Sequence, residues 1–170
     1  MAREPVTILG VDTSLRSSGV GIISSDGIQS RAVSYGVIKN PQKWPVSRAL
    51  ANIADEMEKI LEETQPDLVA VEGVFYCRNA KTALALGQAR GVVIAACAKR
   101  GLPIYEYAPR SVKKGIVGGG SASKDQVAQM IKKLLTLPEI PPEDAADALA
   151  IALCHAHHLR LQGALEPPSI

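Results

Sequence analysis

Four acidic side chains stand where an ordinary soluble domain has little use for a carboxylate: Asp12, Glu72, Asp144 and Asp147. Asp12 ends the apolar run Val6–Val11, Glu72 ends the run Leu68–Val71, and the last two acids open an alanine-rich segment. Apolar runs of this length between turn residues predict buried strands. A carboxylate at the end of a buried strand is costly unless it is paired, hydrogen-bonded or bound to a metal. The pattern therefore predicts a divalent-cation site assembled from three separate segments.

The chemistry of these side chains indicates which cation is expected. Carboxylates suit hard, oxygen-preferring ions, so Mg²⁺ or Mn²⁺ is favoured. A spacing of three puts Asp144 and Asp147 on one face of a helix. Two such ions roughly 4 Å apart form a nuclease arrangement, in which one activates a water and the other holds the leaving oxygen. His155, His157 and His158 cannot share an ion with the acids, because His155 lies about 12 Å of helix beyond Asp147. These histidines are predicted to be solvated residues at a helix end.

Each acid also has a purely structural explanation. Asp12 could hydrogen-bond the backbone of the turn that follows it, and Glu72 could point to solvent at a sheet edge. Asp144 could cap a helix, with Asp147 a first-turn acid favoured by the helix dipole. These explanations let the four acids lie apart. The metal site instead requires the helix face to approach the ends of the two strands.

Hydrophobic periodicity and turn residues define the elements that must position these acids. Strands are predicted at Val6–Asp12, Gly19–Ser24, Ile28–Ile38, Leu68–Val71 and Pro103–Tyr107. Helices are predicted at Ser47–Gln65, Asn79–Arg100, Pro109–Val117, Lys124–Leu135 and Glu143–Leu159. Thr13–Ser18 is predicted as a turn, and Asp26-Gly27 is a strong hairpin signal. An opening hairpin meander followed by βα units predicts an α/β fold with a five-stranded mixed sheet flanked by helices.

Length and composition predict one soluble globular domain. The chain has 170 residues, 46% hydrophobic and 21% charged, and we expect a single domain over residues 1–160 with a disordered tail at 161–170. Three cysteines without a C-x-x-C spacing indicate reduced thiols of a cytosolic protein. Neither a secretory leader nor an apolar segment long enough for a bilayer is recognisable, so a cytoplasmic location is expected.

The charge balance leaves two interpretations open. The formal net charge is only +2, but setting the four acids aside leaves 13 of the 17 acidic residues against 19 Lys and Arg. A basic background around a small acidic centre suits a polyanion held by its phosphates, with metal ions offsetting the acids. Ordinary solvation of the surface explains the same numbers equally well.

Five motifs, in order along the chain, resemble the RuvC family of bacterial Holliday-junction resolvases. They are Asp12 after a strand, Glu72-Gly-Val-Phe-Tyr-Cys-Arg-Asn-Ala, Leu86-Gly-Gln-Ala-Arg-Gly, Ala108-Pro-Arg-Ser-Val-Lys-Lys and Asp144-Ala-Ala-Asp-Ala-Leu-Ala-Ile-Ala. The resemblance runs from about Thr7 to His157. One local departure is that the family usually has Asp-Pro-Gly after the first strand, where this chain has Asp12-Thr13-Ser14.

The resemblance implies an RNase H-like fold and a homodimer that cuts two strands of a four-way DNA junction, with RuvA and RuvB as further partners. It assigns the four acids to two Mg²⁺ ions per subunit, with Mn²⁺ possible. It also implies that the cut DNA has 5′-phosphate and 3′-hydroxyl ends. It places Lys113 and Lys124 at the scissile phosphate, although the neighbouring Lys114 is an alternative. It also implies that Phe75 stacks at the junction centre and that Arg78 binds DNA.

A strip of small residues on the predicted long helix bears on assembly. Ala83, Gly87, Gly91 and Ala95 recur every four residues, which lets another helix approach closely. The strip could pack within the monomer or form a two-fold dimer contact. Two other functions compete with that of a nuclease. One is a junction-binding protein without cleavage. The other is an ATPase of the actin and sugar-kinase type, which begins with an Asp-led phosphate loop that the Ser/Thr-rich segment Asp12–Gly19 resembles weakly.

Overall fold

The computed structural model describes residues 4–73, 79–160, 169 and 170. The strands are β1 (Val6–Asp12), β2 (Ser17–Ser25), β3 (Ser30–Lys39), β4 (Leu68–Glu72) and β5 (Ile104–Tyr107). The helices are α1 (Val46–Thr64), α2 (Ala80–Lys99), α3 (Pro109–Val117), α4 (Lys124–Leu134) and α5 (Glu143–Arg160). Every predicted strand and helix is present, with ends that differ by a few residues.

The five strands form one mixed sheet in the order β3-β2-β1-β4-β5. The meander β1-β2-β3 is antiparallel, while β4 and β5 run parallel to β1. The hairpin between β2 and β3 is closed by Asp26, whose Oδ1 accepts from the backbone N–H groups of Ile28 and Gln29, both at 2.8 Å. The predicted α/β class and mixed sheet are confirmed.

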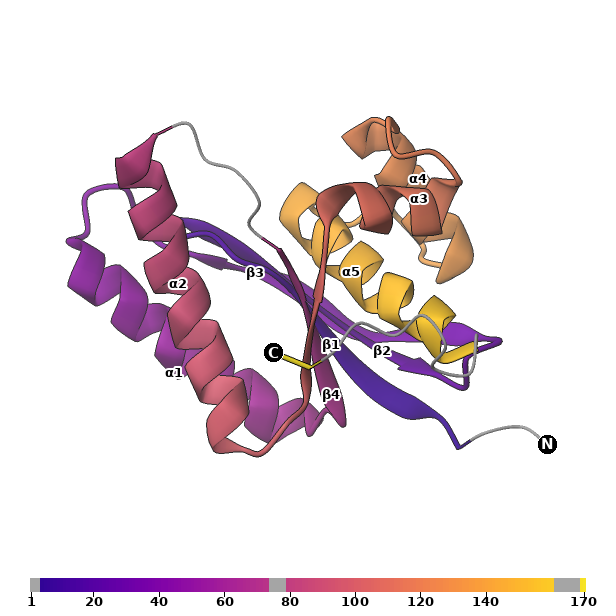
Figure 1. Cartoon of the computed structure of the whole chain (residues 1–170), viewed down its shortest axis with the longest axis horizontal. Helices are drawn as coiled ribbons and strands as arrows, with labels where there is room; N and C mark the ends of the chain where they lie inside the picture. Colours follow the sequence, from indigo (N-terminus) through magenta and orange to yellow (C-terminus); the bar gives the residue numbers. More distant parts are fainter. Residues whose placement is uncertain (1–3, 74–78, 161–168) are drawn as a thin grey trace.

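Helices cover both faces of the sheet, and each face has its own hydrophobic core (Figure 1). α1 and α2 pack on one face, where Ile53, Met57 and Leu61 of α1 are buried. α5 lies across the other face and is covered in turn by α3 and α4. The spacing of Ile53, Met57 and Leu61 is that of an amphipathic helix, which explains why this segment turns the same face inward throughout.

α5 lies unusually close to the sheet because glycines face it. A Cβ at Gly19 would stand 1.8 Å from the carbonyl oxygen of Asp144, and one at Gly10 would stand 2.0 Å from that of Ala148. Any other residue at either position would push the helix away. These two glycines therefore set how near the acids of α5 come to β1.

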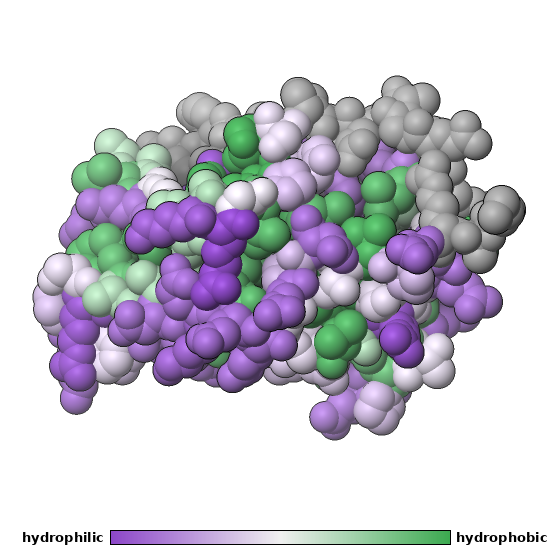
Figure 2. Space-filling model, turned by 90° about the horizontal axis from the view of Figure 1, so that it is seen from below, coloured by the Kyte–Doolittle hydropathy of each residue, from purple (hydrophilic) through white to green (hydrophobic). Residues whose placement is uncertain are grey.

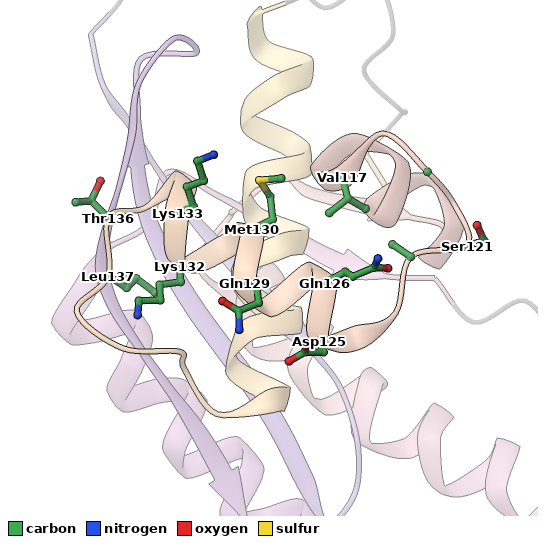
Figure 3. Close-up of a pocket in the computed structure, with 12 residues that line it drawn as sticks. Val117, Ser121, Asp125, Gln126, Gln129, Met130, Lys132, Lys133, Thr136 and Leu137 are labelled. Atoms are coloured by element: carbon green, nitrogen blue, oxygen red, sulfur yellow. The ribbon is translucent and has the colours of Figure 1, made fainter.

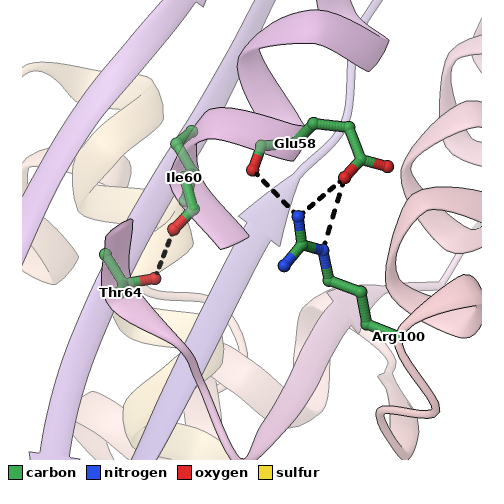
Figure 4. Close-up of polar contacts among 4 residues, drawn as sticks. All are labelled: Glu58, Ile60, Thr64 and Arg100. Carbon is green, nitrogen blue, oxygen red and sulfur yellow. Dashed lines mark hydrogen bonds and ion pairs between the residues drawn. The ribbon is translucent and has the colours of Figure 1, made fainter. Parts of the chain in front are cut away.

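Contacts near the carboxyl ends of α1 and α2 lie at the end of the sheet remote from the carboxyl ends of β1 and β4. Arg100, which follows α2, contacts the Glu58 carboxylate through its Nη2 at 2.9 Å, and Thr64 donates to the Ile60 carbonyl at 2.6 Å near the end of α1 (Figure 4). Seen from this end, hydrophilic residues form much of the surface, with apolar residues between them (Figure 2).

One prediction about the carboxyl-terminal region needs correction. His155 is fully buried, and its Nδ1 lies 2.7 Å from the Tyr107 hydroxyl, so it is not a solvated residue at a helix end. The last two residues of the predicted tail at 161–170 lie beside β5. Ser169 bridges Tyr105 of β5, and Ile170 donates its N–H to the Ile104 carbonyl at 2.9 Å. Residues 161–168 lie outside the described residues.

Of the helices in the described part of the chain, none combines the length and the apolar character needed to cross a bilayer. The thiols of Cys97 and Cys154 are free and buried, and burial raises the pKa of each to about 12. Neither is therefore a reactive thiolate near neutral pH. Cys77 lies outside the described residues.

Candidate metal centre

Strand pairing brings the first two acids side by side. β1 and β4 are parallel neighbours in which Val11 pairs with Val71, so Asp12 and Glu72 follow at the same edge of the sheet. The carboxyl ends of adjacent parallel strands always meet at one edge, and ligand sites in open α/β sheets gather there. The two acids are only half-buried, because each ends its strand where the sheet meets solvent.

The first turns of α5 bring the other two acids to this edge. Asp147 lines a cavity of about 300 Å³ together with Asp12 and Glu72. Asp144 lies beside this cavity and accepts a hydrogen bond from Ser17 Oγ at the start of β2. The predicted approach of one helix face to the ends of two strands is therefore present in the structure.

The cavity combines its three carboxylates with two lysines and an apolar wall. Lys113 of α3 and Lys124 of α4 line it, whereas Lys114 is exposed elsewhere on α3. The apolar lining is Pro109, Val112, Val127, Ala150 and Ile151. Of the two neighbouring lysines that the sequence could not separate, Lys113 is thus the one that lines the cavity, and its charge partly opposes the rise that burial causes in the pKa of Glu72. Phe75 and Arg78 lie outside the described residues.

Electrostatic repulsion within the cluster is strong. The pKa of Asp12 is raised to about 7, first by burial and then by the charges of Glu72, Asp147 and Asp144. The pKa of Glu72 is raised by burial and by Asp147. The pKa of Asp147 is also raised, mainly by burial, although Lys124 opposes the shift. Carboxylates that raise one another's pKa in this way are stabilised by a bound cation.

Lys124 partly offsets the negative charge of the carboxylate cluster. Its amino group pairs with Glu143 and lies 3.5 Å from Asp147 Oδ2. These contacts raise the pKa of Lys124, the hydrogen bond to Glu143 contributing most. The side chain is 61% exposed, so this pairing is easily exchanged for another anion.

The donor set fits a hard divalent ion, although the carboxylates stand too far apart to grip one without moving. Among the described residues, no group of three or more His, Cys, Asp and Glu side chains already converges closely enough to hold an ion. Oxygen ligands on three separate elements suit Mg²⁺ or Mn²⁺.

The structural explanations of the single acids are weaker in the folded protein. The turn after Asp12 is held by Ser18, whose Oγ accepts from Ser14 N at 3.0 Å and donates to the Ser14 carbonyl at 2.6 Å. Asp144 is the second residue of α5 and bonds to Ser17, not to the free N–H groups of the helix end. Glu72 faces the cavity and not open solvent.

Two residues of the site were not foreseen from the sequence. Ser17 is separated from Asp144 by 127 positions, and its neighbours in the sequence predict a turn. Glu143, the partner of Lys124, is recognisable in the sequence only as the start of a helix. An acid in the first turn of a helix is a weak hint, since the dipole favours it anyway. For Ser17 the sequence holds no signal at all.

A second, larger cavity lies apart from the acids. It has a volume of about 940 Å³ and is lined by α4 and the segments on either side of it, including Lys132, Lys133 and Met130 (Figure 3). Asp125 is the one acidic residue among those that line it. A single carboxylate does not make a site for a divalent ion, so the chemistry lies in the smaller cavity.

Comparisons with known proteins agree with this geometry. An RNase H-like sheet with carboxylates from β1, β4 and α5 defines a metal-dependent nuclease domain. The family model described as crossover junction endodeoxyribonuclease RuvC matches residues 8–155. The chain belongs to the RuvC family.

Relatives with this name cover nearly the whole chain. The protein from Syntrophomonas wolfei is 43% identical over 160 residues, 94% of this chain and 93% of its own length. That from Halorhodospira halophila is 48% identical over 151 residues, 89% of this chain and 90% of its own length. The structure of T. thermophilus RuvC in complex with Holliday junction substrate superimposes with a TM-score of 0.85 at 32% identity, covering 95% of this chain and 99% of that chain.

More distant structures share the fold alone. The yeast mitochondrial Holliday junction resolvase Ydc2 superimposes with a TM-score of 0.64 at 13% identity, over 96% of this chain and 85% of that chain. At this level of identity no residue role is transferable, but the RNase H-like arrangement of sheet and helices is the same.

Proposed function

We propose that this protein resolves four-way DNA junctions by paired symmetric nicks. The observation that carries the proposal is the convergence of Asp12, Glu72 and Asp147 with two lysines around one cavity, in a chain of the RuvC family. Lysines attract the negative charge of a phosphodiester, and carboxylates hold metal ions that contact its oxygens, so the two kinds of side chain together suit DNA hydrolysis. The reaction is hydrolysis, leaving a 5′-phosphate and a 3′-hydroxyl.

Each side chain has a distinct task in this proposal. Asp12 and Glu72 hold the cations together with Asp144 or Asp147. Two Mg²⁺ ions per subunit, or Mn²⁺ in their place, would supply an activated water and charge stabilisation at the leaving 3′ oxygen. Lys113 approaches the scissile phosphate from the α3 side of the cavity and offsets the charge that develops on it.

Lys124 takes part by exchanging partners. Without substrate its amino group is held by Glu143 and Asp147. Cations at the cluster would compete for Asp147, and the phosphate would then offer Lys124 a new anionic partner. Such an exchange would bring the lysine beside the phosphate. By family resemblance, Phe75 is proposed to stack at the junction centre and Arg78 to bind DNA.

We infer that the active form is a homodimer formed through α2. Gly87, Gly91 and Ala95 are exposed, and an added Cβ at either glycine meets nothing within 4 Å in the described part of the monomer. Each glycine inside a helix costs about 1 kcal/mol relative to alanine, and no close packing within the described monomer requires that cost. Leu84, 64% exposed, extends the strip. A close helix–helix contact between two copies accounts for these features.

Gly91→Glu tests the dimer. The variant should fold as the wild type does, because the position is open, and it should sediment as a monomer, because a buried carboxylate disrupts the contact. Sedimentation velocity measures the mass, and thermal melting verifies the fold. Ala51→Glu, an equivalent change at an exposed alanine of α1, should leave the mass unchanged. A wild-type protein that sediments as a monomer at micromolar concentration would refute this assembly.

The proposed reaction is tested with a synthetic mobile four-way junction. In the presence of Mg²⁺ we expect two symmetric nicks whose ends are joined again by DNA ligase, and no nicks in EDTA. Linear duplex of the same sequence should remain largely uncut. Junction binding with no metal-dependent nicking would reduce the protein to a binding module, whereas nucleotide hydrolysis without junction affinity would favour an ATPase.

The proposal extends to the cellular setting of the reaction. Because the substrate is chromosomal DNA undergoing recombination or repair, the protein is expected to act in the bacterial cytoplasm. RuvA and RuvB, which move the branch point in the family's known pathway, are proposed as partners on the same junction.

A further inference from the structure

A group of basic residues lies beside the candidate metal centre without belonging to it. Over residues 13–54 the chain carries five cations, Arg16, Arg31, Lys39, Lys43 and Arg48, and a single acid, Asp26 at the far hairpin. Lys39 ends β3, Lys43 and Trp44 lie in the following loop, and Arg48 is in the first turn of α1. We call Lys39, Lys43, Trp44 and Arg48 the β3–α1 surface. Its three cations are exposed.

Strand register places this surface next to the acids. Lys39 is paired with Ser17 across the antiparallel β2–β3 ladder, and Ser17 Oγ donates to Asp144. Directly opposed residues of such a ladder project to the same face, with Cβ atoms about 5 Å apart. Lys39 therefore flanks the metal centre on its β3 side. Lys113 and Lys124 flank the same centre from α3 and α4, on the other side.

The loop between β3 and α1 is held by polar contacts from Asn40 and Arg16. Asn40 is buried, and its Nδ2 donates to the Ala49 carbonyl at 3.1 Å. Arg16 Nη1 donates to the carbonyls of Pro41 at 2.9 Å and Trp44 at 3.0 Å. These contacts fix the backbone on both sides of Lys43. The loop thus presents its side chains from a rigid support, which lowers the entropy cost of binding.

The cations of this surface have no acidic partners of their own. Within the described residues, all ion pairs involve other cations, so no carboxylate neutralises Lys39, Lys43 or Arg48. The Arg48 guanidinium instead lies over the ring of Trp44, 4.0 Å from its centroid. Stacking holds an arginine in place while leaving its charge available to an anion.

The charges along α1 run opposite to what helix stability favours. Its first turn contains Arg48 and no acid, its last turn contains no base, and its acids all lie in the second half. These acids are Asp55, Glu56, Glu58, Glu62 and Glu63. A helix dipole prefers acids at the start and bases at the end. The reversed order leaves a basic end beside the metal centre and an acidic end away from it, which favours a polyanion at the basic end.

We propose that the β3–α1 surface binds the sugar–phosphate backbone of a junction arm as it leaves the cut site. This inference rests on the proposed junction binding and adds a contact that the catalytic cavity does not provide. Lys39, Lys43 and Arg48 each engage a phosphate, and Trp44 keeps Arg48 oriented. Contacts to phosphate set register and affinity without reading sequence. The surface therefore holds an arm so that the scissile phosphate stays over the acids.

The test compares two triple variants of the full chain. Lys39→Ala/Lys43→Ala/Arg48→Ala removes the surface, and Arg31→Ala/Lys59→Ala/Lys99→Ala removes the same charge from exposed positions elsewhere. Junction affinity is measured in EDTA over a series of salt concentrations. We expect the surface variant to bind at least about tenfold more weakly, with a salt slope smaller by about 0.9 for each phosphate that is no longer neutralised.

The outcomes separate this inference from the proposed function. If the surface variant keeps the wild-type affinity and salt slope, or the control variant binds the junction as weakly as the surface variant does, the inference is overturned. If the wild-type protein itself does not prefer a junction to linear duplex, it is the proposed function that fails. Should the triple variant melt early, Lys39→Gln and Lys43→Gln are measured singly, each expected to lower the slope by about 0.9.

Discussion

Asp12→Asn is expected to abolish junction cleavage while junction binding persists. Asp12 lies at the centre of the cluster, since its pKa responds to Glu72, Asp147 and Asp144 alike. An amide of the same shape cannot supply the negative charge that a metal ligand needs. Removing a residue that merely supports a ligand costs up to about a hundredfold, so loss of a ligand should exceed that. The cleavage rate is measured at saturating junction and Mg²⁺.

A matched control is available on α1. Asp55→Asn makes the same chemical change at an exposed acid remote from the cavity, and its cleavage rate should equal that of the wild type. Binding is followed separately by gel shift in EDTA, where Asp12→Asn should bind at least as tightly, because one repulsive charge near the phosphates is gone. A variant that still nicks within about tenfold of the wild-type rate would show that Asp12 is not a metal ligand.

The second large effect concerns the stability of the metal-free protein. Asp12→Asn should unfold at a higher temperature than the wild type above neutral pH. The pKa of Asp12 is about 7 in the folded chain, compared with 3.8 as its ordinary value. Each unit is worth about 1.4 kcal/mol, and after allowance for solvent screening the ionised form costs on the order of 3 kcal/mol. Removing that cost corresponds to a Tm increase of roughly 6–12 °C.

The sign follows from proton linkage. Because the folded pKa of Asp12 is raised, the folded state binds more protons than the unfolded state between pH 3.8 and about 7. Stability must therefore fall as pH rises through this window. His155 acts in the opposite direction, since burial lowers its pKa to about 4 and its stabilisation is lost as pH falls below 6.5. The wild-type profile alone would mix these two groups with Glu72 and Asp147, whose pKa values are also raised.

The difference between the two proteins isolates Asp12. His155, Glu72 and Asp147 are present in both, so the free energy of unfolding of Asp12→Asn minus that of the wild type should be near zero at about pH 4 and grow to about 3 kcal/mol by about pH 8. Adding Mg²⁺ at about pH 8 should stabilise the wild type, by about 2.7 kcal/mol at roughly a hundred times the dissociation constant, and the variant much less. A difference that does not change with pH would contradict the assignment of this electrostatic cost to Asp12.

Several features of the site followed from the sequence because they are local. The end of an apolar run placed Asp12 and Glu72 at strand termini, and a spacing of three placed Asp144 and Asp147 on one helix face. The predicted first strand, Val6–Asp12, has the same bounds as β1 in the structure. These inferences need only the backbone periodicities of strand and helix, which act over a few residues.

Other features were misjudged because burial depends on partners far along the chain. Ser17 was expected in a turn because polar residues surround it, whereas pairing with Lys39 of β3 makes it the first residue of β2. His155 was expected to be solvated, but α5 turns that face toward Tyr105 and Tyr107 of β5. In both cases the local pattern was polar and the tertiary environment overrode it.

The sequence by itself determined the ligand chemistry, the order of the elements and the family, since residue types and short spacings carry that information. Only the tertiary structure decided that Asp147 meets Asp12 and Glu72, and that Lys113 and not Lys114 lines the same cavity. It also decided that Gly87 and Gly91 in the strip of small residues on α2 are left exposed. The reason is that these contacts join segments separated by tens of residues. Their geometry is set by strand order and by how closely α5 can approach two glycines of the sheet.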